Sequence, residues 1–332
     1  MAPDSFKGTF TAVEVAEAIA AGIEAGGGEA ARCPVADGGE GTLAVLLEAL
    51  GGERRSARVH DPLRRPIEAS FAILGDGGTA VVEMAQASGL PLLAPEERDP
   101  ERADTFGTGE LIAAAVATGA KRILVAAGGS ATTDGGCGAI KALQQSEAAF
   151  VLEPASEEQE ANADQVRIEV LCDVQTPFED AARVFAPQKG ADPAAAERLT
   201  QRLNALAAEL PRDPRGVPMS GCAGGLAGGL WAYGAELRPG ADFILDALDF
   251  DARVARADAV VSGEGRFDSQ SLEGKIVGAV AARCTAAGKP LHLIAGERNR
   301  QVELVPAITS VIEAQALDEI EGAGGEIARL QP

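Results

Sequence analysis

The sequence has 332 residues, of which 46% are hydrophobic, enough to bury a large core and to predict two domains rather than one. Its formal net charge of −21 argues against a basic face for nucleic acid or for an anionic membrane, so we expect neither as a partner. Any phosphate site must therefore be built locally, from backbone N–H groups, a few Lys or Arg side chains and Mg²⁺.

The cysteines and histidines also exclude some classes of protein. Five widely spaced cysteines, none in a CxxC pair, and only two histidines argue against a structural zinc site. A Cys–His nucleophile pair stays open as an alternative, although isolated buried cysteines are much more common. The odd cysteine count, with no signal peptide, transit peptide or long apolar span, predicts a cytoplasmic protein.

The first residues form a loop that places Asp4, Ser5 and Lys7 close together. Thr11 is the expected N-cap of a helix over residues 12–26, with Glu14 as its capping-box partner. A doubly wound fold normally begins with a strand before such a loop, and no such strand is predicted here.

A second strand, loop and helix follow. We expect a strand over residues 32–36, a turn containing Asp37 and Glu40, and a helix over residues 43–50. Residues 57–74 and 79–84 have the composition of β segments.

Residues 104–109 open a predicted helix over residues 110–118. The glycine pattern here is an incomplete dinucleotide fingerprint, because Ile112 stands where the third glycine would be. A dehydrogenase is therefore a weak alternative.

Residues 123–143 read as a strand, a glycine-rich turn and a helix. Glycines let several backbone N–H groups face one concavity, and a helix N-terminus adds partial positive charge. This stretch therefore suits a phosphate, with Ser130, Thr132 and Thr133 as hydroxyl donors. Taken alone, a tight connection without any ligand is an equally good interpretation.

The second half of the chain continues the alternation. Residues 147–165 are polar and predict an exposed connection, and a strand over residues 166–172 ends at Asp173. Residues 193–210 are a predicted helix, and the glycine-rich residues 220–230 favour close helix packing. The last expected elements are strands over residues 257–261, 292–295 and 308–312, with Glu264, Arg266 and Asp268 in the loop after the first and Lys275 at the start of a helix.

This alternation predicts an α/β fold with mostly parallel strands. Ligands of such sheets bind at the carboxyl ends of the strands, where the turns at Asp37, Gly128, Asp173 and Glu264 would lie. Carboxylates, a phosphate-binding loop and nearby cations are the parts of a kinase. The candidate cations are Lys7, Lys189, Arg266 and Lys275. A Walker A loop and the protein-kinase HRD and DFG patterns are absent from the sequence.

Eight segments, in order along nearly the whole chain, resemble the bacterial glycerate kinase family, the type that includes the glycerate 2-kinases of glucarate and glyoxylate metabolism. They are PDSFKG (3–8), VADGGEGT (35–42), GTGELI (107–112), GGSATTDGG (128–136), CDV (172–174), PQKGA (187–191), AELRPG (235–240) and GEGRFDSQSLEGK (263–275).

The resemblance implies ATP- and Mg²⁺-dependent phosphorylation of D-glycerate to phosphoglycerate, with 2-phosphoglycerate expected. It also implies two α/β domains with mostly parallel sheets and the active site in the interdomain cleft. We place a discontinuous Rossmann-like domain at residues 1–55 and 255–332, and the second domain at residues 56–254. We expect a monomer or a homodimer.

We assign roles on this basis. Asp173, which directly follows a buried strand, is the first choice for the general base, although it could instead stabilise a turn. The other predicted catalytic residues are Asp268, Lys7 and Arg266. ATP is assigned to Gly128, Gly129, Ser130, Thr132, Asp134, Gly135 and Lys275. Glycerate is assigned to Asp4, Ser5, Lys7, Asp37, Glu264 and Arg266, and Mg²⁺ to Asp37 and Glu40.

Two departures from the family pattern bear on these assignments. The apolar strand expected before residues 3–8 is missing, and Thr133 stands where the family usually has Asn. Two alternatives therefore stay open. One is another small-molecule phosphotransferase or a phosphatase, and the other is a non-catalytic nucleotide-binding member of the family.

Overall fold

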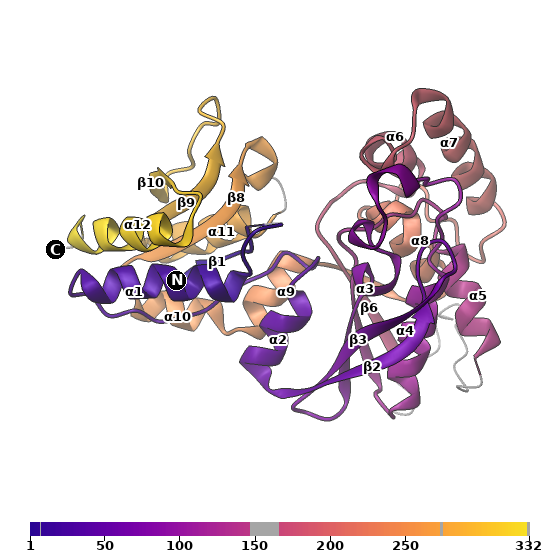
Figure 1. Cartoon of the computed structure of the whole chain (residues 1–332), viewed down its shortest axis with the longest axis horizontal. Helices are drawn as coiled ribbons and strands as arrows, with labels where there is room; N and C mark the ends of the chain where they lie inside the picture. Colours follow the sequence, from indigo (N-terminus) through magenta and orange to yellow (C-terminus); the bar gives the residue numbers. More distant parts are fainter. Residues whose placement is uncertain (7, 147–165, 273–274, 331–332) are drawn as a thin grey trace. The chain divides into compact units, whose positions relative to one another are not determined.

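The computed structural model describes residues 1–6, 8–146, 166–272 and 275–330 (Figure 1). The chain forms two compact units. Unit 1 comprises Met1–Asp37, Ala44–Leu46 and Ala241–Pro332, and unit 2 comprises Gly38–Leu43 and Leu47–Gly240. The domains expected at residues 1–55 with 255–332 and at residues 56–254 stay a prediction. The expected connection over residues 147–165 and the predicted site residue Lys7 lie outside the described residues.

In the described part of unit 1, a parallel sheet has the strand order β1-β8-β9-β10 (Figure 1). The strands are β1 (Ala2–Pro3), β8 (Val260–Phe267), β9 (Leu291–Arg298) and β10 (Ile308–Glu313). A first strand is thus present after all, with Ala2 paired to Ser262. Strand β8 is longer than expected, so Glu264 and Arg266 lie within it and not in a following loop.

The predicted strand over residues 32–36 is wrong. This segment does not form a strand. The N–H groups of Cys33 and Val35 donate to the carbonyls of Met1 and Pro3, at 2.9 and 3.0 Å. Because β1 is only two residues long, residues 32–36 form only these two backbone hydrogen bonds with the described residues at the start of the chain, and no longer ladder develops.

Helices accompany the sheet in the described part of unit 1. They are α1 (Ala12–Ala25), α9 (Gly240–Ala247, whose first residue closes unit 2), α10 (Phe250–Arg256), α11 (Ile276–Ala287) and α12 (Leu317–Leu330), with a short turn η6 (Ser269–Leu272). The capping box of Thr11 and Glu14 is present at the start of α1, as predicted. In α1, Val15 and Ile19 share a buried cluster with Ile320 and Ile327 of α12, and the two helices lie side by side (Figure 1).

The contact between α1 and α12 makes Gly22 sensitive to substitution. A Cβ at Gly22 would lie 1.9 Å from the carbonyl oxygen of Glu321, whereas a Cβ at Gly322 would meet nothing within 4 Å. We expect Gly22→Ala to lower the free energy of unfolding by about 1–3 kcal/mol, because the helices must move apart. Gly322→Ala should raise it by up to about 1 kcal/mol, because alanine favours the helix. Urea unfolding of both variants tests this pair, and equal effects would contradict the close contact.

In the described part of unit 2, a mixed sheet has the strand order β2-β3-β4-β5-β6-β7. The strands are β2 (Gly52–His60), β3 (Pro66–Leu74), β4 (Thr79–Glu83), β5 (Arg122–Ala126), β6 (Arg167–Cys172) and β7 (Glu236–Pro239). The pairs from β2 to β4 are antiparallel, and those from β4 to β7 are parallel. Mostly parallel sheets with covering helices confirm the predicted α/β fold class.

The helices of unit 2 are α2 (Thr42–Leu50, with Ala44–Leu46 counted in unit 1), α3 (Ala85–Ser88), α4 (Phe106–Ala117), α5 (Cys137–Gln145), α6 (Ala181–Phe185), α7 (Pro193–Ala207) and α8 (Leu226–Ala232). Short 3₁₀ turns are η1 (Leu90–Leu92), η2 (Pro95–Glu97), η3 (Phe178–Asp180), η4 (Pro187–Lys189) and η5 (Cys222–Gly225). None of the helices in the described part of the chain is long and apolar enough to span a lipid bilayer.

The glycine-rich residues 220–230 pack closely, as expected. A Cβ at Gly224 would lie 2.0 Å from the carbonyl oxygen of Thr132, and one at Gly229 would lie 2.2 Å from that of Gly135. These glycines bring η5 and α8 directly against the loop between β5 and α5. That loop contains the predicted phosphate-binding residues.

Candidate active site

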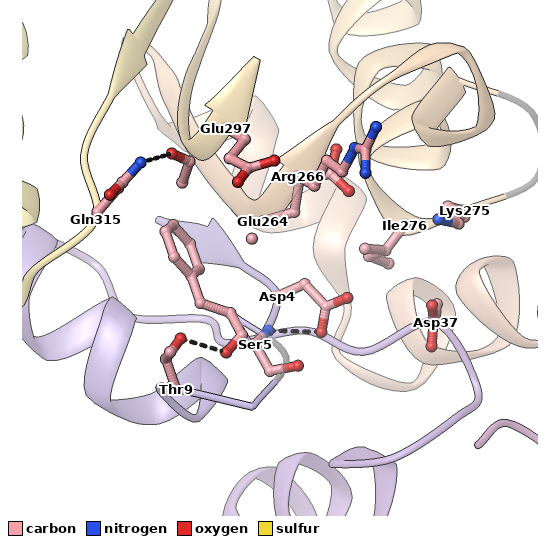
Figure 2. Close-up of a pocket in the computed structure, with 13 residues that line it drawn as sticks. Asp4, Ser5, Thr9, Asp37, Glu264, Arg266, Lys275, Ile276, Glu297 and Gln315 are labelled. Atoms are coloured by element: carbon pink, nitrogen blue, oxygen red, sulfur yellow. Dashed lines mark hydrogen bonds between the residues drawn. The ribbon is translucent and has the colours of Figure 1, made fainter. Parts of the chain in front are cut away.

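A pocket of about 480 Å³ lies at the carboxyl ends of β1, β8 and β9 in unit 1 (Figure 2). Asp4 and Ser5 follow β1, Glu264 and Arg266 extend from β8, and Lys275 is the N-cap of α11. The full lining is Asp4, Ser5, Phe6, Thr9, Asp37, Glu264, Gly265, Arg266, Lys275, Ile276, Gly296, Glu297 and Gln315. The structure therefore brings together the described residues predicted to bind glycerate, with Lys275, which was predicted to bind ATP.

The charges of this pocket, here called the unit 1 pocket, are mixed. Among the described residues, its lining contains four carboxylates, Asp4, Asp37, Glu264 and Glu297, and the cations Arg266 and Lys275. Local hydrogen bonds shape its wall: Ser5 N donates to Asp4 Oδ1 at 2.7 Å, and Gln315 Nε2 donates to the Gly296 carbonyl at 3.1 Å (Figure 2). Among the described lining residues, Arg266 and Lys275 are the cations available to an anionic ligand, which would lie among the carboxylates.

Asp268, a predicted catalytic residue, does not line this pocket. Its Oδ1 accepts from Gln270 N at 3.0 Å, and its own N–H donates to the Ser271 hydroxyl at 3.0 Å. Its Oδ2 lies 3.6 Å from Nε of Arg266, whose side chain is 69% exposed. These contacts give Asp268 a clear local task, which is to hold the turn η6 and to accompany Arg266.

A second, smaller cavity lies in unit 2 at the carboxyl ends of β5 and β6, and is here called the unit 2 pocket. Its volume is about 90 Å³, and its lining includes Gly128, Gly129, Ser130, Asp173 and Lys189. The main chain bends sharply at Gly129, which has a φ of 74°. Four residues predicted from two separate loops, Gly128, Gly129, Ser130 and Asp173, therefore meet at one cavity.

The loop at Gly128 also packs against the chain just before α2. Ala127 N donates to the carbonyl of Gly38 at 3.0 Å, and a Cβ at Gly128 would lie 2.6 Å from Gly39 Cα. The buried Glu83 accepts from Leu43 N at 2.8 Å, and burial raises the pKa of Glu83. Three strand ends and the start of α2 thus converge at this edge of the sheet.

Cys222 fixes the carboxylate of Asp173. The Cys222 Sγ donates to Asp173 Oδ1 at 3.3 Å. A hydrogen bond with Cys172, together with burial, raises the pKa of Cys222 well above its ordinary value. Cys222 therefore stays a neutral thiol near neutral pH, and its S–H remains available to donate to the Asp173 carboxylate. No pattern in the sequence predicts this contact, since Cys222 lies in a segment interpreted as packing.

Three residues predicted to bind ATP line neither pocket. Asp134 is buried, and its carboxylate accepts hydrogen bonds from N and Oγ1 of Thr105 and from the N–H groups of Gly136 and Gly138, at 2.8–3.1 Å. Gly135 N donates to the Gly224 carbonyl. The carbonyl of Thr132 faces Lys189, while its hydroxyl has no hydrogen-bond partner among the described residues. Asp134 and Gly135 therefore hold the conformation of the loop through internal hydrogen bonds.

Lys189 was predicted only as one of four candidate cations, without a place in a site. The structure places it in the lining of the unit 2 pocket. It is 2% exposed, and its Nζ donates to Ser130 Oγ at 2.7 Å and to the Thr132 carbonyl at 2.6 Å. Burial lowers its pKa to about 8.

The predicted Mg²⁺ ligands differ in exposure. Asp37 is 2% exposed and lines the unit 1 pocket, whereas Glu40 is exposed and lines neither pocket. Within the described residues, no three His, Cys, Asp or Glu side chains are grouped to hold a metal. Kinases usually hold Mg²⁺ through one or two carboxylates and the substrate phosphates, and one or two carboxylates are available here.

Comparisons with known proteins agree with this architecture. Residues 1–318 match the model of the glycerate kinase family. The chain is 41% identical to glycerate kinase of Bacillus subtilis, over 92% of this chain and 86% of the relative, and 38% identical to glycerate 2-kinase of Escherichia coli, over 99% and 94%. A crystal structure described as that of a glycerate kinase 2 from Salmonella typhimurium LT2 superposes with a TM-score of 0.79 at 34% identity, covering 99% of this chain and 96% of that one. The chain is therefore an enzyme of the glycerate kinase family.

Proposed function

We propose that this kinase transfers the γ-phosphoryl group of ATP to D-glycerate, giving 2-phosphoglycerate and ADP. The observation that carries the proposal is the unit 2 pocket, where the Gly128–Ser130 loop, the Asp173 carboxylate and the Lys189 ammonium surround one cavity of about 90 Å³. A cavity of this size suits the phosphoryl group that is transferred. The membership of the glycerate kinase family supports glycerate as the acceptor.

In the proposed reaction, Asp173 is the general base. The hydroxyl oxygen of glycerate forms a bond to the γ-phosphorus, and the bond from that phosphorus to the β–γ bridging oxygen breaks. The hydroxyl proton passes to the Asp173 carboxylate, and ADP leaves with the bridging oxygen. The Cys222 thiol donates a hydrogen bond to one oxygen of this carboxylate and so holds the general base in position.

The glycine-rich loop is proposed to bind the phosphates of ATP. The backbone at Gly128 and Gly129 and the hydroxyl of Ser130 supply neutral donors, which suit phosphate oxygens in a strongly acidic protein. Thr132, Asp134 and Gly135 are proposed to act in the same loop by maintaining its shape.

The unit 1 pocket is proposed to bind glycerate, through Asp4, Ser5, Asp37, Glu264 and Arg266, with Lys275 available to a phosphate. Lys7 and Asp268 keep their predicted catalytic roles as part of this proposal. Carboxylates are suitable acceptors for the two hydroxyl groups of glycerate, and Arg266 is suited to its carboxylate.

Arg266→Lys tests the assignment of the carboxylate. Because lysine cannot reproduce the planar two-point contact of a guanidinium with a carboxylate, we expect the KM for glycerate to rise about tenfold, with a smaller change in the KM for ATP. Steady-state kinetics with each substrate varied in turn measure both constants. An unchanged KM for glycerate would contradict the assignment.

Mg²⁺ is proposed to be held by Asp37, with Glu40 of the same loop as the second carboxylate. When bound, it would neutralise charge on the phosphates of ATP. Asp37 and Glu40 are oxygen donors, which is the ligand type that Mg²⁺ prefers.

A coupled assay of ADP formation tests the proposed function. We expect ADP to form only when ATP, Mg²⁺ and D-glycerate are all present. Release of inorganic phosphate without glycerate would indicate a phosphatase, and tight ATP binding without turnover would indicate a non-catalytic nucleotide-binding protein.

The five free cysteines support a reducing, cytoplasmic location as part of the same proposal. A monomer or a homodimer is proposed as the assembly.

A further inference from the structure

Lys189 is a buried cation whose hydrogen-bond partners are uncharged. Its Nζ donates to a hydroxyl and a carbonyl, those of Ser130 and Thr132. An ammonium group has three protons, so these two bonds leave one proton without a hydrogen-bond acceptor in the described part of the chain. Burying a cation in this way is strongly unfavourable unless an anion arrives to compensate it.

The local fold does not require a charged side chain at this position. The turn η4 is closed by backbone bonds, from Lys189 N to the Ala186 carbonyl at 3.0 Å and from Gly190 N to the Pro187 carbonyl at 3.1 Å. Ala191 N donates to the same Ala186 carbonyl at 3.1 Å. A neutral side chain of similar length would leave all of these bonds in place.

Three titratable groups face Lys189 from neighbouring elements: Asp134 in the loop before α5, Asp173 after β6, and Cys222 in η5. The Asp134 carboxylate is already committed to four donors, and the raised pKa of Cys222 keeps it a neutral thiol. Asp173 lines the unit 2 pocket together with Lys189. Because Lys189 lines the same cavity, an anion that enters it would lie next to the ammonium group and would add to the compensation that the two carboxylates give.

We propose that Lys189 is the phosphate-binding cation of the unit 2 pocket and that it orients the Ser130 hydroxyl toward the same phosphoryl group. Because Ser130 Oγ accepts a hydrogen bond from Lys189, its own proton is left to donate to a phosphate oxygen. The ammonium group would also stabilise charge on the phosphoryl group during transfer. This inference rests on the proposed function and names the cation that the function needs in unit 2.

Two variants of Lys189 and one control test the proposal. Lys189→Met removes the charge, Lys189→Arg keeps it at every practical pH, and Lys141→Met removes an exposed lysine on α5. We expect kcat/KM to fall at least a hundredfold in Lys189→Met, which is typical for the loss of one electrostatic contact to a transition state. In the control, Lys141→Met, it should fall less than threefold. We also expect millimolar inorganic phosphate to raise the melting temperature of the wild type and of Lys141→Met, but not that of Lys189→Met.

The pH profile separates a charge role from a packing role. Lys189, with a pKa of about 8, is protonated below that pH and neutral above it. The kcat/KM of the wild type should therefore fall as pH rises through about 8, and Lys189→Arg, though slower, should lack this fall. The pH profile of Lys189→Arg also provides the test if Lys189→Met does not fold.

Two results would overturn the proposal: near-wild-type kcat/KM in a folded Lys189→Met, or an unchanged alkaline fall in Lys189→Arg. Both of these kinetic results can be measured only if the wild type is active. A wild type that binds phosphate but makes no phosphoglycerate would instead contradict the proposed function. A phosphate-induced melting shift that depends on Lys189 would then still support Lys189 as the phosphate-binding cation.

Discussion

Replacing Asp173 with Asn is expected to lower kcat by about a hundredfold or more, the usual range for the loss of a general base. The substitution keeps the size of the side chain and leaves an oxygen to accept the hydrogen bond from the Cys222 thiol. The amide cannot take the hydroxyl proton of glycerate, so the loss should fall on kcat while both KM values change little. Steady-state kinetics at saturating ATP and glycerate measure it.

Asp213→Asn is the matched control. Asp213 is also in unit 2, but it is exposed and paired only with Arg215 in the described structure. Its removal should leave kcat within about twofold of the wild type, because exposed ion pairs contribute little. Near-wild-type turnover in Asp173→Asn would remove Asp173 from the role of base.

Asp134→Ala is expected to lower the free energy of unfolding by about 3 kcal/mol or more, because each buried donor left unsatisfied costs roughly 1–3 kcal/mol. The carboxylate now accepts from Thr105, Gly136 and Gly138, and it joins the starts of α4 and α5. Losing it should also loosen the loop that contains Ser130. Urea unfolding followed by circular dichroism measures the change.

Asp192→Ala provides the comparison for this stability effect. Asp192 is the N-cap of α7, and its side chain accepts a single hydrogen bond, from Ala195 N at 2.7 Å. We expect a loss of about 1 kcal/mol, the usual cost of removing such a cap. Equal losses in the two variants would show that Asp134 is an ordinary cap and not the centre of a buried network.

Local signals made much of the fold predictable. The capping box of Thr11 and Glu14 defined the start of α1, and the apolar run before Gly128 defined β5. The strand β1 escaped prediction because two residues cannot show a period, and its partner, Ser262, is far along the chain. Residues 32–36 have the composition of a strand, but their hydrogen bonds to this short β1 do not extend into a ladder.

The candidate site was predictable where one rule applied, namely that ligands gather at the carboxyl ends of parallel strands. This rule brought Gly128 and Asp173 to one cavity. It could not find Cys222, whose contact with Asp173 depends on how η5 packs. Nor could it separate Asp134, committed to internal donors, from loop residues that face the cavity, because both lie in one glycine-rich stretch.

Phosphorus NMR of the products tests the central claim most directly. With ATP, Mg²⁺ and D-glycerate, we expect the purified protein to give ADP and a new phosphomonoester signal, split into a doublet by the single proton on carbon 2. A triplet would place the phosphate on the 3-hydroxyl and would contradict 2-phosphoglycerate as the product. Inorganic phosphate as the only product, or no turnover while ATP stays bound, would contradict the proposed phosphorylation of glycerate.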